Sequence, residues 1–349
     1  MLNPIKIDLK PREVSQKLLA MIQNKRVRDV LTSRFGLKNG DKKTLEAIGK
    51  EYGITRERVR QIEADGLKIL ATPAVYGLAE SVFAAMKEHL DEHGGVASEE
   101  HLLHSIGDKK NAAHVHFLLT VGKQFKKESE GSHTKSVWFT SKEAKEAVEK
   151  TLASVHKLLE QEKAPVSKER VLEMIKKEAE RVMEMRPKEH QVHNYLGISK
   201  HIAENPYGEY GLASWSTIHP KGVRDKAYLV LSKSGKPMHF REVASGINKM
   251  GWGKKPAHPQ TVHNELIKSS DLFVLVGRGV YALREWGYTP GTVSEVMTAV
   301  MKETGRPMSR DEVVKKVLEK RFVKENTILL NLQNRSMFSR VEGNKYFLV

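Results

Sequence analysis

The chain has 349 residues, with 59 Lys and Arg against 43 Asp and Glu, a net charge of +16 and no cysteine. The length predicts about two or three domains, and the missing cysteine excludes disulfides, thiol catalysis and cysteine-ligated zinc. No apolar run approaches the roughly 20 residues of a membrane helix, and the N-terminus lacks a signal-peptide core, so we expect a cytoplasmic protein without a membrane segment. The positive charge predicts a polyanionic partner.

The charge is concentrated at the two ends of the chain. Residues 1–73 hold 16 basic and 9 acidic residues, and residues 222–349 hold 22 and 12. The middle, residues 74–221, holds 21 basic and 22 acidic residues. We therefore expect the ends to contact the polyanion and the middle to act as a spacer or as a surface that contacts protein.

Residues 26–70 have the pattern of a helix-turn-helix. Thr44 and Thr55 are expected to cap two helices, and Gly53 supplies the sharp turn between them. Apolar residues recur at positions that would pack the two helices together, namely Leu45, Ile48, Ile54, Val59, Ile62 and Leu67. Several polar residues in the first two turns of the second helix then point away from that packing, namely Arg56, Glu57, Arg60 and Gln61.

A recognition helix presents such N-terminal side chains to base edges in the major groove. Arginine can pair with guanine, glutamine with adenine, and glutamate can accept a hydrogen bond from cytosine N4. The spacing alone leaves a second interpretation open, in which this is an ordinary helical hairpin with a solvated Arg/Glu face.

Three motifs in this segment resemble region 4 of the housekeeping-type bacterial sigma factors, over roughly residues 20–72. They are Arg34-Phe-Gly-Leu37, Thr44-Leu-Glu-Ala-Ile-Gly-Lys-Glu-Tyr-Gly-Ile54 and Thr55-Arg-Glu-Arg-Val-Arg-Gln-Ile-Glu-Ala64. The resemblance implies a domain that reads the −35 promoter element and docks on the flap of the RNA polymerase β subunit. It departs from the family at Asp65-Gly66, where an acid lies near the phosphates and a glycine weakens the helix.

Carried over by position, the resemblance assigns base reading to Arg56, Glu57 and Gln61. It assigns contacts with the DNA backbone to Thr55, Arg58, Arg60 and Lys68. The helical region with which sigma factors grip the polymerase clamp and melt the −10 element is not recognisable here, so we do not expect promoter opening by this chain alone.

A repeated motif follows in the rest of the chain. Gly235-Lys-Pro-Met-His-Phe-Arg-Glu-Val243 aligns with Gly305-Arg-Pro-Met-Ser-Arg-Asp-Glu-Val313, residues 163–171 fit the same frame, and residues 94–102 fit it more loosely. Each copy continues into an apolar helical block and a short hairpin, which an apolar residue opens and an aromatic residue closes. These pairs are Ile202 with Tyr210, Phe273 with Tyr281, Phe338 with Tyr346 and, in a longer hairpin, Phe125 with Trp138.

Each copy therefore reads helix, helix, helix and hairpin, which is a winged helix-turn-helix. The predicted fold class is mainly α with small β-wings. The predicted domains are a sigma region 4-like helix-turn-helix at 1–73 and four winged-helix units at about 75–140, 143–216, 222–288 and 290–349.

The third copy resembles the HARE-type winged helix, found in the delta subunit of bacterial RNA polymerase and fused to chromatin and restriction proteins. The resemblance lies in residues 235–243, 262–266 and 276–287, and Tyr281-Ala-Leu-Arg-Glu-Trp286 is its most distinctive part. It implies a module linked to nucleic acid or transcription. In the turns of the last two hairpins, Arg278 and Lys345 are candidate DNA-backbone contacts, with plain solvated residues as the alternative.

The sequence offers little for catalysis. It has no phosphate-binding G-x-x-x-x-G-K-[ST] loop, and the pairs His101/His104 and His114/His116 have no acidic partners at metal-site spacing. We expect no catalytic residues, metal or cofactor. The predicted function is a sigma-like DNA-binding transcription factor that binds double-stranded DNA and acts with RNA polymerase. The alternatives are a polymerase-bound accessory subunit and a sequence-indifferent architectural protein.

Overall fold

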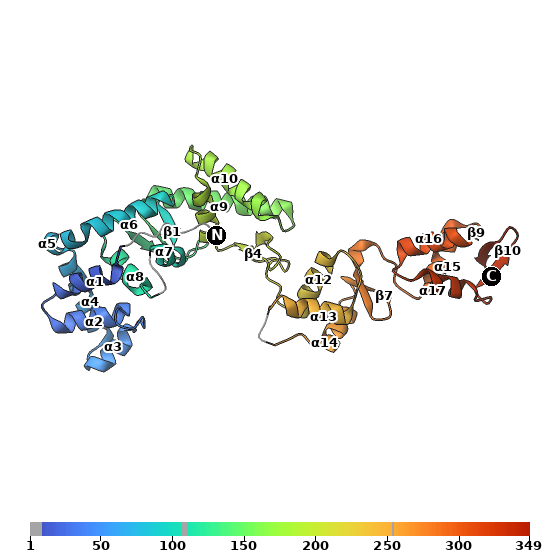
Figure 1. Cartoon of the computed structure of the whole chain (residues 1–349), viewed down its shortest axis with the longest axis horizontal. Helices are drawn as coiled ribbons and strands as arrows, with labels where there is room; N and C mark the ends of the chain where they lie inside the picture. The colour runs from blue at the N-terminus through green and yellow to red at the C-terminus, as the bar shows by residue number, and fades with distance from the viewer. Residues whose placement is uncertain (1–8, 107–109, 253–254) are drawn as a thin grey trace. The chain divides into compact units, whose positions relative to one another are not determined.

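The computed structural model describes residues 9–106, 110–252 and 255–349 (Figure 1). The chain divides into two compact units, Met1–Ser214 and Trp215–Val349. Within the described residues, helices and small antiparallel sheets make up both units, so the predicted mainly α fold with β-wings is confirmed.

The first unit begins with four helices that we call the head. They are α1 (Pro11–Ala20), α2 (Lys25–Phe35), α3 (Leu45–Tyr52) and α4 (Arg56–Leu70). The Thr44 hydroxyl accepts from the amide of Ala47 at 3.1 Å, and the Thr55 hydroxyl accepts from the amide of Arg58 at 3.2 Å. Both predicted caps are thus confirmed, and they fix where α3 and α4 begin.

Two glycines allow the tight turn between α3 and α4. Gly53 has a φ of 61°, in the left-handed region that a glycine enters without strain. A Cβ on Gly49 would lie 2.7 Å from the carbonyl oxygen of Ile54, so only a glycine lets the chain pass this close to α3. The apolar side chains of Val30, Ile48, Val59 and Ile62 then form the small core of the helix-turn-helix.

A short helix α5 (Pro73–Tyr76) and a 3₁₀ turn η1 (Gly77–Ala79) lead into the first winged helix. That winged helix contains α6 (Glu80–Glu92), β1 (Val96–Ser98), α7 (Glu99–Ile106), α8 (Ala112–Val121), β2 (Lys126–Glu128) and β3 (Val137–Phe139). Its strands pair in the order β1-β3-β2. The second winged helix contains α9 (Lys142–Glu162), α10 (Lys168–Met183), α11 (Glu189–Ile198), β4 (Ile202–Glu204) and β5 (Tyr210–Leu212).

The second unit holds two further winged helices. One contains α12 (Val223–Ser234), β6 (Met238–His239), α13 (Phe240–Lys249), α14 (Pro259–Lys268), β7 (Phe273–Gly277), β8 (Val280–Leu283) and the 3₁₀ turn η2 (Arg284–Trp286). The other contains α15 (Val293–Thr304), β9 (Met308–Ser309), α16 (Arg310–Lys320), α17 (Glu325–Leu332), β10 (Phe338–Val341) and β11 (Lys345–Leu348). Their sheets have the equivalent orders β6-β8-β7 and β10-β11-β9.

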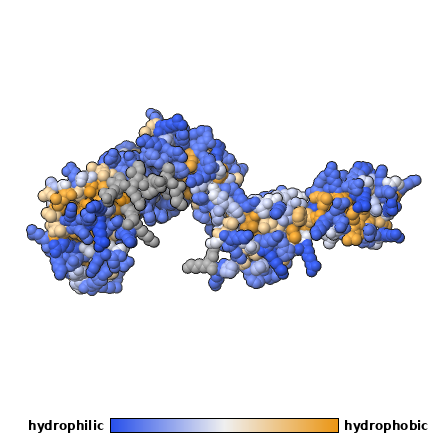
Figure 2. Space-filling model, in the orientation of Figure 1, coloured by the Kyte–Doolittle hydropathy of each residue, from blue (hydrophilic) through white to orange (hydrophobic). Residues whose placement is uncertain are grey.

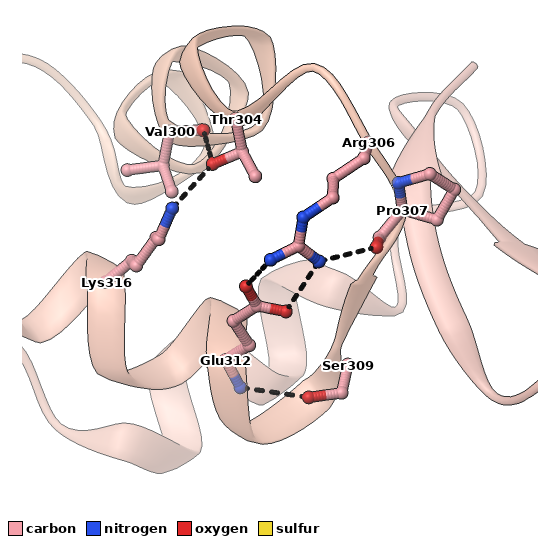
Figure 3. Close-up of polar contacts among 7 residues, drawn as sticks. All are labelled: Val300, Thr304, Arg306, Pro307, Ser309, Glu312 and Lys316. Atoms are coloured by element: carbon pink, nitrogen blue, oxygen red, sulfur yellow. Dashed lines mark hydrogen bonds and ion pairs between the residues drawn. The ribbon is translucent and has the colours of Figure 1, made fainter.

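The repeated sequence motif marks the junction between the first and second helices of a winged helix. In the last copy Gly305 ends α15 with a φ of 67°, buried Met308 lies in β9, and the Ser309 hydroxyl caps α16 by accepting from the amide of Glu312. The Glu312 carboxylate accepts from the Arg306 guanidinium at 2.5 and 3.2 Å, which ties the turn to α16 (Figure 3). Gly235 and His239 play the corresponding parts between α12 and α13.

The predicted hairpins are present, and their openers pair with an apolar residue of the returning strand. Phe273 lies opposite Leu283 and Phe338 lies opposite Leu348. In the first winged helix the longer hairpin pairs Lys127 with Trp138.

The head and the first winged helix share one hydrophobic core. Leu31 and Phe35 of α2 pack with Phe117 and Leu118 of α8, and the Phe35 and Phe117 ring centroids are 5.2 Å apart. The predicted boundary near residue 74 therefore lies within continuous packing, and the division into five domains remains a prediction.

Among the described residues, no single helix is long and apolar enough to cross a membrane. Helices Arg56–Leu70 and Pro73–Glu92 meet those requirements only when counted together, across a bend of 71°.

Candidate nucleic-acid interface

The outward face of α4 brings the predicted base readers together. Val59, Ile62, Gly66 and Leu70 are buried and set which face of the helix points inward. The polar residues of the first two turns are exposed, namely Arg56, Glu57, Arg58, Arg60 and Gln61. Figure 2 shows a largely hydrophilic surface on the visible side of the helix-turn-helix, as an interface with DNA requires.

These side chains pair with one another along the helix. Arg60 donates to the Glu57 carboxylate through Nε at 2.9 Å and Nη2 at 2.6 Å, and Arg58 Nη1 donates to Gln61 Oε1 at 3.0 Å. The hydrogen bond from Arg60 lowers the pKa of Glu57, so this carboxylate is ionised at neutral pH. Exposed pairs of this kind are weak, so base edges can replace them.

The predicted backbone contacts are also placed on α4. Thr55 lies at its N-cap, next to the positive end of the helix dipole, where a phosphate is favoured. Lys68 is exposed in the last turn, and its Nζ lies 3.8 Å from Asp65 Oδ1. Asp65 therefore lowers the net charge that this end of the helix presents.

Gly66 has a packing role that the sequence did not indicate. A Cβ at this position would lie 2.7 Å from Val27 Cγ1 and 2.8 Å from Leu31 Cδ1. The glycine therefore lets α4 approach α2 closely, and α4 runs unbroken from Arg56 to Leu70.

The third helix of each winged helix is the usual DNA-reading element of this fold, but the first two are covered. In α8 no residue is exposed, because the helix packs against α1, α2 and α7. In α11 the Asn194 side chain donates to the carbonyls of His93 at 2.8 Å and Val96 at 2.6 Å, so this helix is held against the first winged helix. The sequence did not predict this packing, although α8 is almost wholly apolar.

The third helices of the second unit remain open. On α14 the exposed residues are Gln260, Thr261, Asn264, Ile267 and Lys268. On α17 the exposed residues include Glu325, Asn326 and Leu330, and Leu330 is 67% exposed. Of these two helices, α14 has the polar and basic character of a DNA-binding surface.

The two predicted wing residues also lie in the second unit. Arg278 is exposed at the turn between β7 and β8. Lys345 is exposed as the first residue of β11, where it lies opposite Val341 on one side and Ser309 on the other.

The histidine pairs noted in the sequence have structural partners. His116 Nε2 lies 3.2 Å from Glu99 Oε1, and this contact, together with Lys127, lowers the pKa of Glu99 to about 2. His104 Nδ1 hydrogen-bonds the Glu100 carbonyl at 2.7 Å. Within the described ranges, no group of three histidine or acidic residues is arranged to hold a metal ion.

Comparison with known proteins covers two segments of the chain. A family model for sigma-70, region 4 matches residues 24–71, and a model for the HARE-HTH domain, the HTH domain of ASXL and restriction endonuclease proteins, matches residues 223–286. The RNA polymerase sigma factor SigA of Clostridium acetobutylicum is 45% identical over 65 residues, which are 18% of this chain and 17% of that protein. SigA of Nostoc sp. is 50% identical over 62 residues, which are 18% of this chain and 16% of that protein.

The chain therefore spans only about a sixth of the length of these relatives. Both matched families are DNA-binding types and neither is an enzymatic family. Residues 24–71 are of the sigma-70 region 4 type and residues 223–286 are of the HARE-HTH type, a combination that indicates a DNA-binding, transcription-related role.

Proposed function

We propose that this protein is a sigma-like DNA-binding transcription factor whose helix α4 reads a −35-like promoter or operator element, and that it acts with RNA polymerase. The observation that carries the proposal is the exposed polar face of α4 on a capped helix-turn-helix of the sigma region 4 type. Arg56, Glu57 and Gln61 read base edges from its first two turns.

Phosphate contacts position the reading helix. Thr55, Arg58, Arg60 and Lys68 supply them around α4, and Arg278 and Lys345 add contacts from the second unit. The excess of basic residues in 222–349 supports this role, because cations that neutralise phosphates release counterions and strengthen binding.

The neutral middle of the chain acts as a scaffold. The burial of α8 and α11 supports this, since both would-be reading helices are engaged in contacts inside the first unit. The first winged helix thus holds the head in place rather than binding DNA through α8.

The partner is RNA polymerase, through the flap of its β subunit. Of the large apolar side chains that stay exposed, Met21 (47%) and Ile69 (37%) belong to the described residues of the head. A hydrophobic patch is visible in Figure 2 near the position of α1 and α5 in Figure 1, and we expect it to contribute to this contact. The apolar face of α2 is already covered by α8.

The test is fluorescence anisotropy of the protein on a −35-like duplex and on a scrambled duplex of the same composition, across a salt series. We expect a preference of 100-fold or more, about 2.7 kcal/mol. Gln61→Ala removes a base contact but no charge, so it should reduce the preference and leave the salt slope unchanged. Lys50→Ala, an exposed change on α3, is the control for a single lost charge.

Equal affinity for both duplexes, with the same salt slope, would contradict base reading. A sequence-indifferent architectural protein would give that result and would respond to Lys50→Ala and Arg56→Ala alike. A polymerase-bound accessory subunit would bind both duplexes weakly and be retained by immobilised polymerase.

A further inference from the structure

The first unit contains a cavity of about 440 Å³ between its two winged helices. The turn at Gly95 forms one side, and Ala144 and Ala147 of α9 form another. Met183 at the end of α10, Met185 in the following loop and Tyr195 of α11 complete the lining. Figure 1 shows α9 and α10 as the green helices that follow the first winged helix. The volume lies in the range of sites that bind small molecules.

Tyr195 is a buried hydrogen-bond donor without a strong acceptor. Its side chain is 2% exposed, and its hydroxyl donates to Met183 Sδ at 3.9 Å, a weak thioether acceptor. Burial raises the pKa of Tyr195 to about 12, so the phenol keeps its proton at neutral pH. A Cβ on Gly94 would lie 2.2 Å from this hydroxyl, so the glycine preserves the space beside it.

The other polar groups around the cavity are already engaged. The Thr140 hydroxyl donates to Asp91 at 2.6 Å and the Ser141 hydroxyl donates to Glu143 at 2.6 Å. The Gln191 amide group donates to the Glu92 carbonyl at 3.1 Å, and its oxygen accepts from the amide of Lys188 at 2.9 Å. A ligand is therefore offered one free donor, the Tyr195 hydroxyl, within an otherwise apolar lining.

We propose that this cavity binds a neutral, mainly apolar small molecule that carries one acceptor oxygen, such as a ketone or ester carbonyl, and that Tyr195 donates a hydrogen bond to that oxygen. Met183 and Met185 can adjust to the shape of the apolar body, because methionine side chains are flexible and polarizable. The site is independent of the DNA-reading face of α4.

The probe is 6-propionyl-2-(dimethylamino)naphthalene, a neutral fluorescent ketone whose emission shifts to the blue in apolar surroundings. Titration into the full-length protein should give a saturable blue shift with one site per chain. Tyr195→Phe removes only the hydroxyl and should weaken binding by about 3- to 10-fold, the value of one neutral hydrogen bond. Ala147→Trp fills the cavity and should abolish the shift.

Two matched variants control for the chemistry of these changes. Tyr52→Phe removes a phenol hydroxyl in the head, and Lys150→Trp adds an indole on an exposed position of α9 outside the cavity lining. Both should bind the probe as the parent does. Failure of the parent to saturate, or equal binding by the parent, Tyr195→Phe and Ala147→Trp, would overturn the proposal. Because Tyr195→Phe loses only a weak internal contact, it decides the matter even if Ala147→Trp fails to fold.

Discussion

Gly66 lies in the middle of α4 and is buried against α2. By sequence alone this glycine weakens a helix, by about 1 kcal/mol relative to alanine. The structure gives the reason for keeping it, because Val27 and Leu31 occupy the space that a side chain would need. The residue that departs from the sigma pattern therefore sets the distance between the reading helix and its support.

Gly66→Val should destabilise the first unit. The branched side chain would overlap Val27 and Leu31, and overpacking of this kind costs about 1–3 kcal/mol. Urea unfolding monitored by circular dichroism measures the change. Gly77→Ala is the control, since no atom lies within 4 Å of the place that its Cβ would take and its φ is −58°. An unfolding free energy as high for Gly66→Val as for Gly77→Ala would contradict the packing role.

His89 makes the stability of the first unit depend on pH. It is 1% exposed, and burial, with smaller effects from His93 and His101, lowers its pKa to about 4. The unfolded chain has a histidine pKa near 6.5, so below that pH the unfolded state binds more protons. The stability from His89 is complete above about pH 6.5 and is lost as the pH falls toward 4.

We expect a loss of up to about 1.4 kcal/mol per pH unit between pH 6 and 4.5, measured by urea unfolding. His89→Gln keeps an amide group that can reach Ser105, the present partner of His89 Nε2 at 2.9 Å, and should flatten this dependence. An identical pH dependence in the variant would assign the effect to other groups.

At the scale of elements, α8 connects the head to the first winged helix. Phe117 of α8 is fully buried and stacks edge-on against Phe35 of α2. A deletion of residues 75–216 would remove α8 and expose the core of the head. Such a deletion therefore cannot test whether the middle of the chain is only a spacer.

Phe117→Ala should destabilise the head and the first winged helix together, by about 3–5 kcal/mol. Hydrogen exchange should show faster exchange in both α2 and α8. Phe338→Ala, an equally buried change in the second unit, should leave exchange in α2 and α8 as it was. Faster exchange in α8 alone would mean that the head folds independently.

At the scale of the molecule, the two units divide the work of binding. The base-reading residues lie in the first unit, whereas the largest excess of positive charge lies in residues 222–349. Sequence preference and salt dependence should therefore separate when the units are separated.

A fragment of residues 1–214 should keep the preference for a −35-like duplex but bind with lower affinity and a shallower salt slope. Each phosphate that the second unit neutralises adds about 0.9 to the slope of the full chain. Anisotropy of the fragment and the full chain on the same two duplexes measures both quantities. An unchanged slope would exclude the second unit, with Arg278 and Lys345, from binding DNA.

Local features were predictable from the sequence because they depend on a few neighbouring residues. Thr44 and Thr55 cap their helices through hydroxyls that reach amides three residues on, and Gly53 and Gly305 take the left-handed turns. The periodicity of Ile48, Val59 and Ile62 likewise determined which face of α4 is exposed. The candidate reading face was thus available from the sequence alone.

Only the tertiary structure decided what the middle of the chain does. The apolar residues of α8 could have packed inside their own winged helix, and nothing in their spacing indicates α2 as the partner. The same holds for Asn194 on the His93 and Val96 carbonyls and for the cavity beside Tyr195. These contacts join residues far apart in the chain, so they depend on how whole elements pack, which local sequence patterns do not encode.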